Sequence, residues 1–149
     1  MIRQFRDTDN VACSQLICDC LHNDRSLSPL LREKMRKHET PETMLARARL
    51  FYTAVYESEN RILGIVGLDM NEIRLLYVSP ESQRRGIGRM LLDYIRPMVP
   101  GALFPDIFVY ASLQSVGFYK AYGFTEKGSL DFDFDGKPIP TVFLTLCPK

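Results

Sequence analysis

Three strand-like segments follow one another between Leu50 and Val78, and this run constrains the fold more than any other feature of the chain. The segments Leu50 to Glu57, Arg61 to Met70 and Glu72 to Val78 are rich in aromatic and β-branched residues, which favour extended backbone. Only a few residues separate one segment from the next. Connections this short cannot hold a crossover helix, so we expect an antiparallel sheet in the middle of the chain.

Helical and extended patterns alternate around this run. Apolar positions between Val11 and Leu21 recur at helical spacing and predict a first helix of about 13 residues, and helical spacing returns from Pro29 to His38 and from Thr40 to Ala48. The later elements are a helix from Gly86 to Met98, a strand from Ile107 to Tyr110, a helix from Gln114 to Tyr122 and a hairpin that turns at Asp135-Gly136. The predicted order is βααβββαβαββ, a single α/β (α+β) domain over residues 1–149.

Composition narrows the class of protein. The 149 residues are 46% hydrophobic and 25% charged, close to the globular average, which argues against disorder and fibrous folds. A net charge of +1 argues against a dedicated nucleic-acid binder. The longest apolar stretch, Ile62 to Leu68, is far shorter than the roughly 20 residues of a membrane span. The charged start MIRQFRDTDN does not suit a secretory signal, so we expect a cytoplasmic protein without membrane association.

A glycine-containing loop joins the third strand to the next helix. Gly86 and Gly88 let the backbone turn sharply and approach a ligand, and the following helix directs unpaired N–H groups at the loop. Arg84, Arg85 and Arg89 add positive charge. These features predict an anion site suited to a pyrophosphate, with a plain strand–helix turn carrying surface arginines as the alternative.

Two common phosphate loops do not match this segment. A P-loop needs G-x-x-x-x-G-K-[ST], which is absent. A dinucleotide fingerprint would need glycine at Leu91, and it would lie in a parallel βαβ unit rather than after antiparallel strands.

The segment Gln83-Arg84-Arg85-Gly86-Ile87-Gly88 instead resembles the signature [Q/R]-x-x-G-x-[G/A] of the GNAT superfamily of acetyl-CoA-dependent N-acetyltransferases. A second segment, Ala111 to Phe124, is similar to the family block A-[S/N]-x-x-A-x-x-[F/L]-Y-x-x-x-G-F. Two motifs in the right order are far more specific than either alone. The resemblance implies a mixed, largely antiparallel central sheet of about seven strands flanked by helices.

The resemblance also implies how the cofactor is held. In this family the fourth and fifth strands splay apart, and the pantetheine arm of acetyl-CoA lies between them against the backbone of the fourth strand. The loop amides then bind the pyrophosphate. The positions that carry over to this chain as cofactor-binding are Leu76, Tyr77, Val78, Gln83, Arg84, Arg85, Gly86, Ile87, Gly88, Arg89 and Ser112. Ser112 replaces a common asparagine and has a shorter reach.

Two residues carry over as catalytic. Tyr119 matches the motif tyrosine that protonates the departing thiolate of coenzyme A, the alternative being a packed tyrosine whose hydroxyl is satisfied locally. Glu72 lies at the spacing of a family glutamate that acts as general base, although a solvated carboxylate or a pair with Arg74 is equally open. Asp69 is the reserve base. Tyr122 is expected to pack.

Strand alternation would place four residues of the third predicted strand on one face: Glu72, Arg74, Leu76 and Val78.

The acceptor is the least determined part of the interpretation. The family builds its acceptor pocket from the first helices and the last hairpin, here roughly Cys20 to Ala48 and Leu130 to Pro140. Three carboxylates on one face of the hairpin, Asp131, Asp133 and Asp135, could meet a cationic acceptor or simply be solvated. We expect a small-molecule or peptide amine as partner, a possible homodimer, and no metal, because the four cysteines form no metal-binding spacing.

Three functions therefore remain open. The first is an active N-acetyltransferase, which converts acetyl-CoA into coenzyme A. The second is a module of the same fold that binds acyl-CoA with little or no turnover. The third is a different enzyme that uses the glycine loop for another phosphate-bearing ligand.

Overall fold

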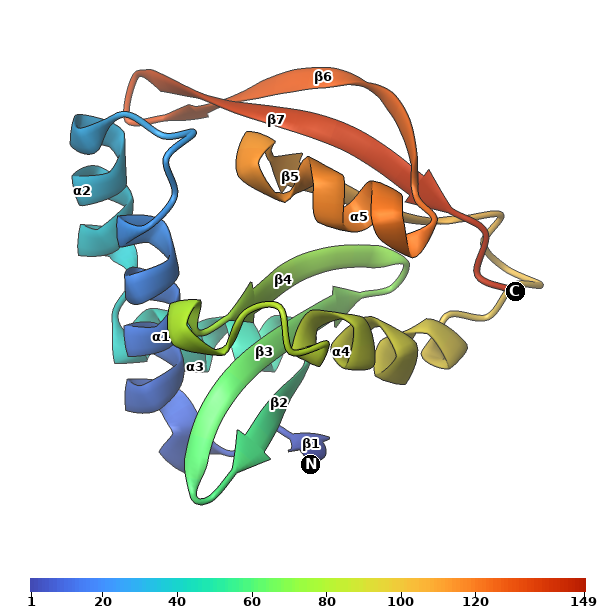
Figure 1. The fold of residues 1–149 in the computed structure, drawn as a ribbon, viewed down its shortest axis with the longest axis horizontal. Helices are drawn as coiled ribbons and strands as arrows, with labels where there is room; N and C mark the ends of the chain where they lie inside the picture. Colours follow the sequence, from blue (N-terminus) through green and yellow to red (C-terminus); the bar gives the residue numbers. More distant parts are fainter.

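A seven-stranded sheet with the order β1-β2-β3-β4-β5-β7-β6 organises the computed structural model, which describes all 149 residues (Figure 1). All neighbouring strands are antiparallel except β4 and β5, which are parallel. The strands are β1 (Ile2–Gln4), β2 (Tyr52–Ser58), β3 (Arg61–Asp69), β4 (Glu72–Val78), β5 (Ile107–Ser112), β6 (Thr125–Phe134) and β7 (Lys137–Leu146). The α-helices are α1 (Asn10–His22), α2 (Pro29–His38), α3 (Pro41–Leu50), α4 (Ile87–Ile95) and α5 (Val116–Tyr122). The predicted mixed, largely antiparallel sheet flanked by helices is confirmed.

Three helices lie between β1 and β2, so the two helices of the predicted order are one too few. Glu39 leaves helical backbone, with φ −86° and ψ 86°, and this ends α2. Thr40 then starts α3, because its side-chain oxygen accepts the N–H of Thr43 at 3.1 Å and Pro41 occupies the first helical position. The three helical segments expected before the first long strand are therefore all present, although the predicted order counted only two of them.

The sheet has a hydrophobic core on each face. Leu91 of α4 and Val66 of β3 are fully buried in one core, which α4 and α5 cover. Ile17 of α1, Met44 of α3 and Ile65 of β3 are fully buried in the other. The adjacent β3 residues Ile65 and Val66 thus pack into the cores on opposite faces of the sheet, as the two-residue period of a strand requires.

A β-bulge at Arg74 breaks the alternation expected along β4. Two adjacent residues of β3 pair with Leu75 and Ile73, which leaves Arg74 as an extra residue. Ile73 therefore shares a core with Leu76, although they are three residues apart. The prediction that Glu72 and Arg74 share a face with Leu76 and Val78 is wrong, because the bulge reverses the pleat between them.

Strands β4 and β5 are paired over only two residues each. Glu72 pairs with Phe108 and Ile73 with Val109, and no pairing continues beyond them. The splay that the family resemblance implied is present, and it divides the sheet into β1–β4 and β5–β7. In Figure 1, α5 lies between β4 below and the β6–β7 hairpin above.

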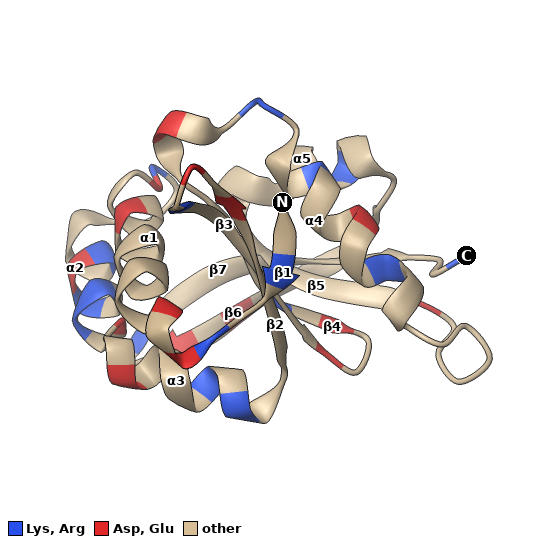
Figure 2. Ribbon diagram, turned by 90° about the horizontal axis from the view of Figure 1, so that it is seen from below, with Lys and Arg blue, Asp and Glu red and all other residues tan.

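Charged residues are spread over the helices, strands and loops. Lys and Arg recur along α2 and α3, where acidic residues accompany them (Figure 2). None of the helices has the length and apolar character needed to cross a bilayer.

Candidate functional site

Two adjoining cavities occupy the region where β4 and β5 separate. The larger has a volume of about 510 Å³ and is lined by α1, the α1–α2 connection, β4, β5, α5 and β7. The smaller, of about 450 Å³, is lined by the glycine loop, the end of β4 and α5. Six residues line both cavities: Leu76, Val78, Gln83, Gln114, Ser115 and Tyr119. We call the larger cavity the acceptor-side cavity and the smaller one the loop-side cavity.

The loop before α4 has a strained backbone. Gly86, the N-cap of α4, has φ +81°, and Arg84 has φ +65°, a region that residues with a side chain rarely adopt. A Cβ added at Gly86 would meet no protein atom within 4 Å, so the space beside it is open. A Cβ at Gly88 would lie 3.0 Å from the ring of Phe118, so glycine there allows α4 and α5 to pack closely.

Consecutive amides of this loop have no hydrogen-bond acceptor within the protein. The N–H groups from Arg84 to Arg89 donate to no backbone or side-chain oxygen in the structure, and the α4 ladder begins with the N–H of Met90 on the carbonyl of Gly86. Together with the positive end of the α4 dipole, they create a site for an anion. Gln83 ties the start of the loop to β4, since its Nε2 donates to the carbonyl of Val78 at 3.1 Å.

The arginines of the loop differ in their positions. Arg84 and Arg89 line the loop-side cavity, whereas Arg85 lines neither cavity. The Arg89 guanidinium lies 5.3 Å from the ring centre of Tyr122, and the Tyr122 hydroxyl donates to Asp93 at 2.6 Å. Tyr122 therefore packs outside the cavities, as expected, and helps to position Arg89.

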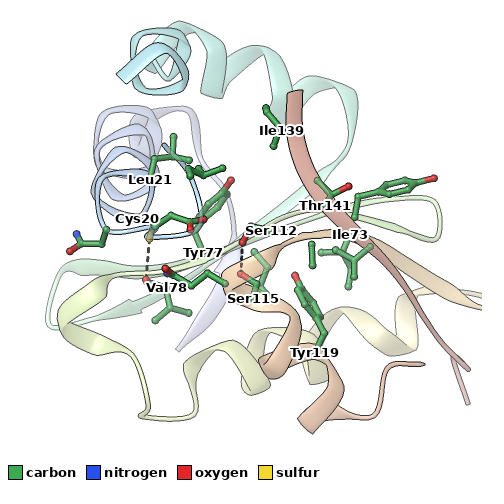
Figure 3. Close-up of a pocket in the computed structure, with 18 of the residues that line it drawn as sticks. Cys20, Leu21, Ile73, Tyr77, Val78, Ser112, Ser115, Tyr119, Ile139 and Thr141 are labelled. Carbon is green, nitrogen blue, oxygen red and sulfur yellow. Dashed lines mark hydrogen bonds between the residues drawn. The ribbon is translucent and has the colours of Figure 1, made fainter. Parts of the chain in front are cut away.

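The end of β4 forms one wall of the acceptor-side cavity. Leu76, Tyr77 and Val78, the predicted pantetheine-binding positions, all line it. Figure 3 shows Tyr77 and Val78 there. The thiol of Cys20 donates to the carbonyl of Val78 at 3.1 Å, and burial raises the pKa of this thiol to about 12. Burial also raises the pKa of Tyr77, with Glu39 adding to the effect. Both groups therefore stay protonated and uncharged at neutral pH.

Tyr119 lies where the two cavities meet. It extends from α5, is 4% exposed, and packs its ring 5.2 Å from those of Phe118 and Phe124. Its hydroxyl makes no hydrogen bond to the protein, so the local partner considered in the sequence analysis is absent. Burial raises the pKa of Tyr119, with a smaller contribution from Tyr77. The site thus presents a protonated hydroxyl at the junction.

Glu72 lies outside the lining of both cavities. Its Oε1 is 3.9 Å from a guanidinium nitrogen of Arg74, which does line the acceptor-side cavity and which pairs with Asp69 at 3.2 Å. Burial raises the pKa of Glu72, against the opposing effect of Arg74. The structure brings Tyr119 and the glycine loop together, but neither Glu72 nor Asp69 reaches the same lining.

Ser112 lines the acceptor-side cavity, where its hydroxyl is 3.0 Å from that of Ser115. Cys20, at the start of the expected acceptor segment, lines the same cavity, whereas Ser115 and Gln114 were not expected as lining residues. Gln114 occupies a position that the family motif leaves variable, whereas Ser115 stands where the motif has alanine. No sequence signal marks Ser115 and Gln114, because only the tertiary fold brings them to the gap.

The predicted acceptor segments do contribute to the acceptor-side cavity. Leu27 and Met35 come from the first segment and Ile139 from the second. None of Asp131, Asp133 and Asp135 lines it. The carboxylate that does so belongs to Asp24, in the α1–α2 connection.

This chain belongs to the GNAT acetyltransferase family. The acetyltransferase (GNAT) domain matches residues 25–139, which is more than half of the chain. A peptidyl-lysine N-acetyltransferase, YjaB of Salmonella typhimurium, is 31% identical over 93 residues. That match covers 62% of this chain and 62% of the relative, so it spans less than two thirds of either protein.

Solved structures support the fold. A GCN5-related N-acetyltransferase from Rhodopseudomonas palustris superimposes with a TM-score of 0.91 at 17% identity, over 99% of this chain and 94% of that one. YncA, described as a putative acetyltransferase from Salmonella typhimurium and solved with its cofactor acetyl-CoA, gives a TM-score of 0.69 at 17% identity. That alignment covers 100% of this chain and 94% of YncA.

We predict that Gly86→Glu abolishes coenzyme A binding, because the new side chain projects a carboxylate into the open space beside unpaired amides. Gly136→Glu is the matched control. Gly136 has φ +79°, also has no atom within 4 Å of an added Cβ, and lies in the β6–β7 turn away from the loop. Titration calorimetry with coenzyme A should show binding to the control and none to Gly86→Glu. Equal coenzyme A affinities of Gly86→Glu and Gly136→Glu would exclude a role of this loop in cofactor binding.

Proposed function

We propose that this chain is an N-acetyltransferase that moves an acetyl group from acetyl-CoA to a primary amine, with lysine side chains of peptides as the favoured acceptor class. The observation that carries the proposal is the unbonded, protonated Tyr119 hydroxyl at the junction of two cavities. The names of the relatives support lysine as the acceptor.

The residues of the gap suit coenzyme A. The amides of Arg84 to Arg89 can hold the pyrophosphate, and Arg84 and Arg89 add charge beside it. The side of the β4 backbone from Leu76 to Val78 that has no β5 partner can bind the pantetheine arm, with the Ser112–Ser115 pair on the opposite side; Cys20 and Gln83 already donate to the Val78 carbonyl. When bound there, acetyl-CoA supplies the acetyl group as a thioester, which an amine can attack directly.

The side chains of this chain then have two tasks. An alkyl ammonium, with a pKa of about 10.4, must lose a proton before it can attack, and Glu72, through water, is our candidate to take it. Tyr119 holds a proton at its hydroxyl and can donate it to the departing sulfur. The raised pKa of Tyr119 keeps that proton available throughout the neutral range.

One observation favours the alternative of an acyl-CoA-binding module with little turnover. Glu72 lies outside both cavity linings, so no carboxylate at the expected base position contacts the acceptor side directly. If water relays the proton to Glu72, the protein can catalyse transfer. Without such a relay, the protein would bind acyl-CoA without turnover.

A panel of amines distinguishes the two functions. We expect the protein with acetyl-CoA to release free thiol when a lysine peptide is added, and to release less with acceptors that lack a primary amine. Detection of free thiol, with mass spectrometry of the acetylated product, measures the reaction. Coenzyme A binding without thiol release for any amine would establish the module instead.

The role of Tyr119 is tested by Tyr119→Phe. We predict that turnover falls about tenfold or more while coenzyme A affinity is nearly unchanged, because only the proton donor is lost. Tyr122→Phe is the control, since it removes a tyrosine hydroxyl from the same helix but outside the cavities. Full turnover in Tyr119→Phe would exclude the residue as the acid.

The role of Glu72 is tested by the pH dependence of turnover. Only the carboxylate form can accept a proton, so activity should rise as the pH increases through the raised pKa of Glu72. Glu72→Gln should lower turnover and remove this rise on the acidic side of the pH profile, whereas Asp69→Asn should retain the rise. An unchanged rise of turnover with pH in Glu72→Gln would mean that another group, or water alone, takes the proton.

A further inference from the structure

The acceptor-side cavity contains only two charged side chains, Asp24 and Arg74. Asp24 is 8% exposed, although it belongs to the polar connection between α1 and α2. A carboxylate this enclosed normally has partners for both oxygens, since burying an unpaired charge is costly. The hydrogen bonds and ion pairs of Asp24 and Arg74 therefore show which of the two charges in this cavity has no partner.

The two carboxylate oxygens of Asp24 have different environments. Oδ1 accepts the backbone N–H of Ser26 at 2.9 Å and its hydroxyl at 2.6 Å, which shapes the turn. Oδ2 takes part in no hydrogen bond or ion pair. The only completely enclosed side-chain nitrogen or oxygen without a partner is Nε of Arg36, so Oδ2 borders accessible space. Because Asp24 lines the acceptor-side cavity, we take this space to be the cavity.

The charge of Arg74 is already balanced. Its guanidinium pairs with Asp69 at 3.2 Å, lies 3.9 Å from Glu72, and covers the ring of Phe51 at 5.5 Å from the ring centre. No cation is paired with Asp24. The acceptor-side cavity therefore carries one uncompensated negative charge, and a positively charged group would complete it.

The fold holds Asp24 in this position from both sides. The N–H of the next residue, Arg25, donates to Oε1 of Gln114 at 2.7 Å, which joins the α1–α2 connection to the short 3-10 helix after β5. Leu27 anchors the other side, because it is buried in the core beneath α1 and α2. Leu27 and Met35 also provide apolar surface in the same cavity.

We propose that Asp24 is a specificity-determining residue whose Oδ2 binds the ammonium group of the acceptor, while Leu27 and Met35 contact its alkyl stem. This inference rests on the proposed function, because it assigns the acceptor end of the same site. The Asp24 carboxylate selects alkyl primary ammonium groups, such as the lysine side chain, over neutral molecules of the same size.

The test uses n-butylamine, whose ammonium and four-carbon stem reproduce the lysine side chain, and the neutral isostere 1-butanol. Each is titrated by NMR into the protein saturated with coenzyme A, where no acetyl transfer can occur. We expect Asp24→Asn to weaken n-butylammonium binding about tenfold, the usual scale for a hydrogen bond to a charged group, and to leave 1-butanol unchanged. Asparagine keeps an oxygen for the Ser26 contacts, and Asp24→Ser repeats the test with a different side chain.

Ser26→Ala is the matched control, because it removes the hydroxyl that contacts Oδ1 but keeps the charge. It should bind n-butylammonium like the wild type. In turnover with a lysine peptide, Asp24→Asn should raise KM with little change in kcat, which a general loss of structure would not produce.

Equal n-butylammonium affinities in the wild type and Asp24→Asn, or no binding to the wild type, would overturn the proposal. Normal acetylation with no effect of Asp24 would reject this inference and keep the proposed function. Charge-selective binding that depends on Asp24, without acetylation of any amine, would keep the inference and reject the proposed function.

Discussion

The separation of β4 from β5 after two paired residues is the constraint on which the rest of the site depends. A strand normally satisfies its backbone groups with both neighbours, so an interrupted pairing in the middle of a sheet leaves polar backbone without a strand partner. Here the consequence is two adjoining cavities, with β4 on one side and α5 on the other. The parallel pairing at Glu72 and Ile73 joins the two halves of the sheet, and no strand pairing continues beyond that point.

Polar groups are arranged unevenly around this gap. On the loop side, consecutive amides and the start of α4 provide positive potential without requiring any particular side chain. At the junction, burial keeps Tyr119 and Tyr77 protonated, and Cys20 caps a β4 carbonyl. On the acceptor side, Asp24 leaves a negative charge unbalanced. An anionic cofactor and a cationic acceptor would thus meet across an uncharged centre, which suits a reaction between them.

The fold was largely predictable from local patterns. Short connections between strands, the Asp135-Gly136 turn and the glycine loop all have local physical causes, and the structure contains each of them. The predicted order counted two helices before β2 where the structure has three, although all three helical segments and the start at Thr40 and Pro41 were read from the sequence. The face assigned to Glu72 was wrong because the bulge at Arg74 depends on pairing with β3, which no single strand reveals. Whether Glu72 acts as base stays a prediction.

The amino-acid sequence alone indicated most of the elements, the sharp turn of the glycine loop and the two motifs that flank the gap, since each depends on residues close together in the chain. Only the tertiary structure decided which groups surround the gap. Cys20, Asp24, Gln114 and Ser115 come from separate elements, and they reach one cavity because the sheet opens between β4 and β5. The physical reason is that burial and charge balance depend on every neighbour in space, whereas turns and helix starts depend mainly on neighbours in sequence.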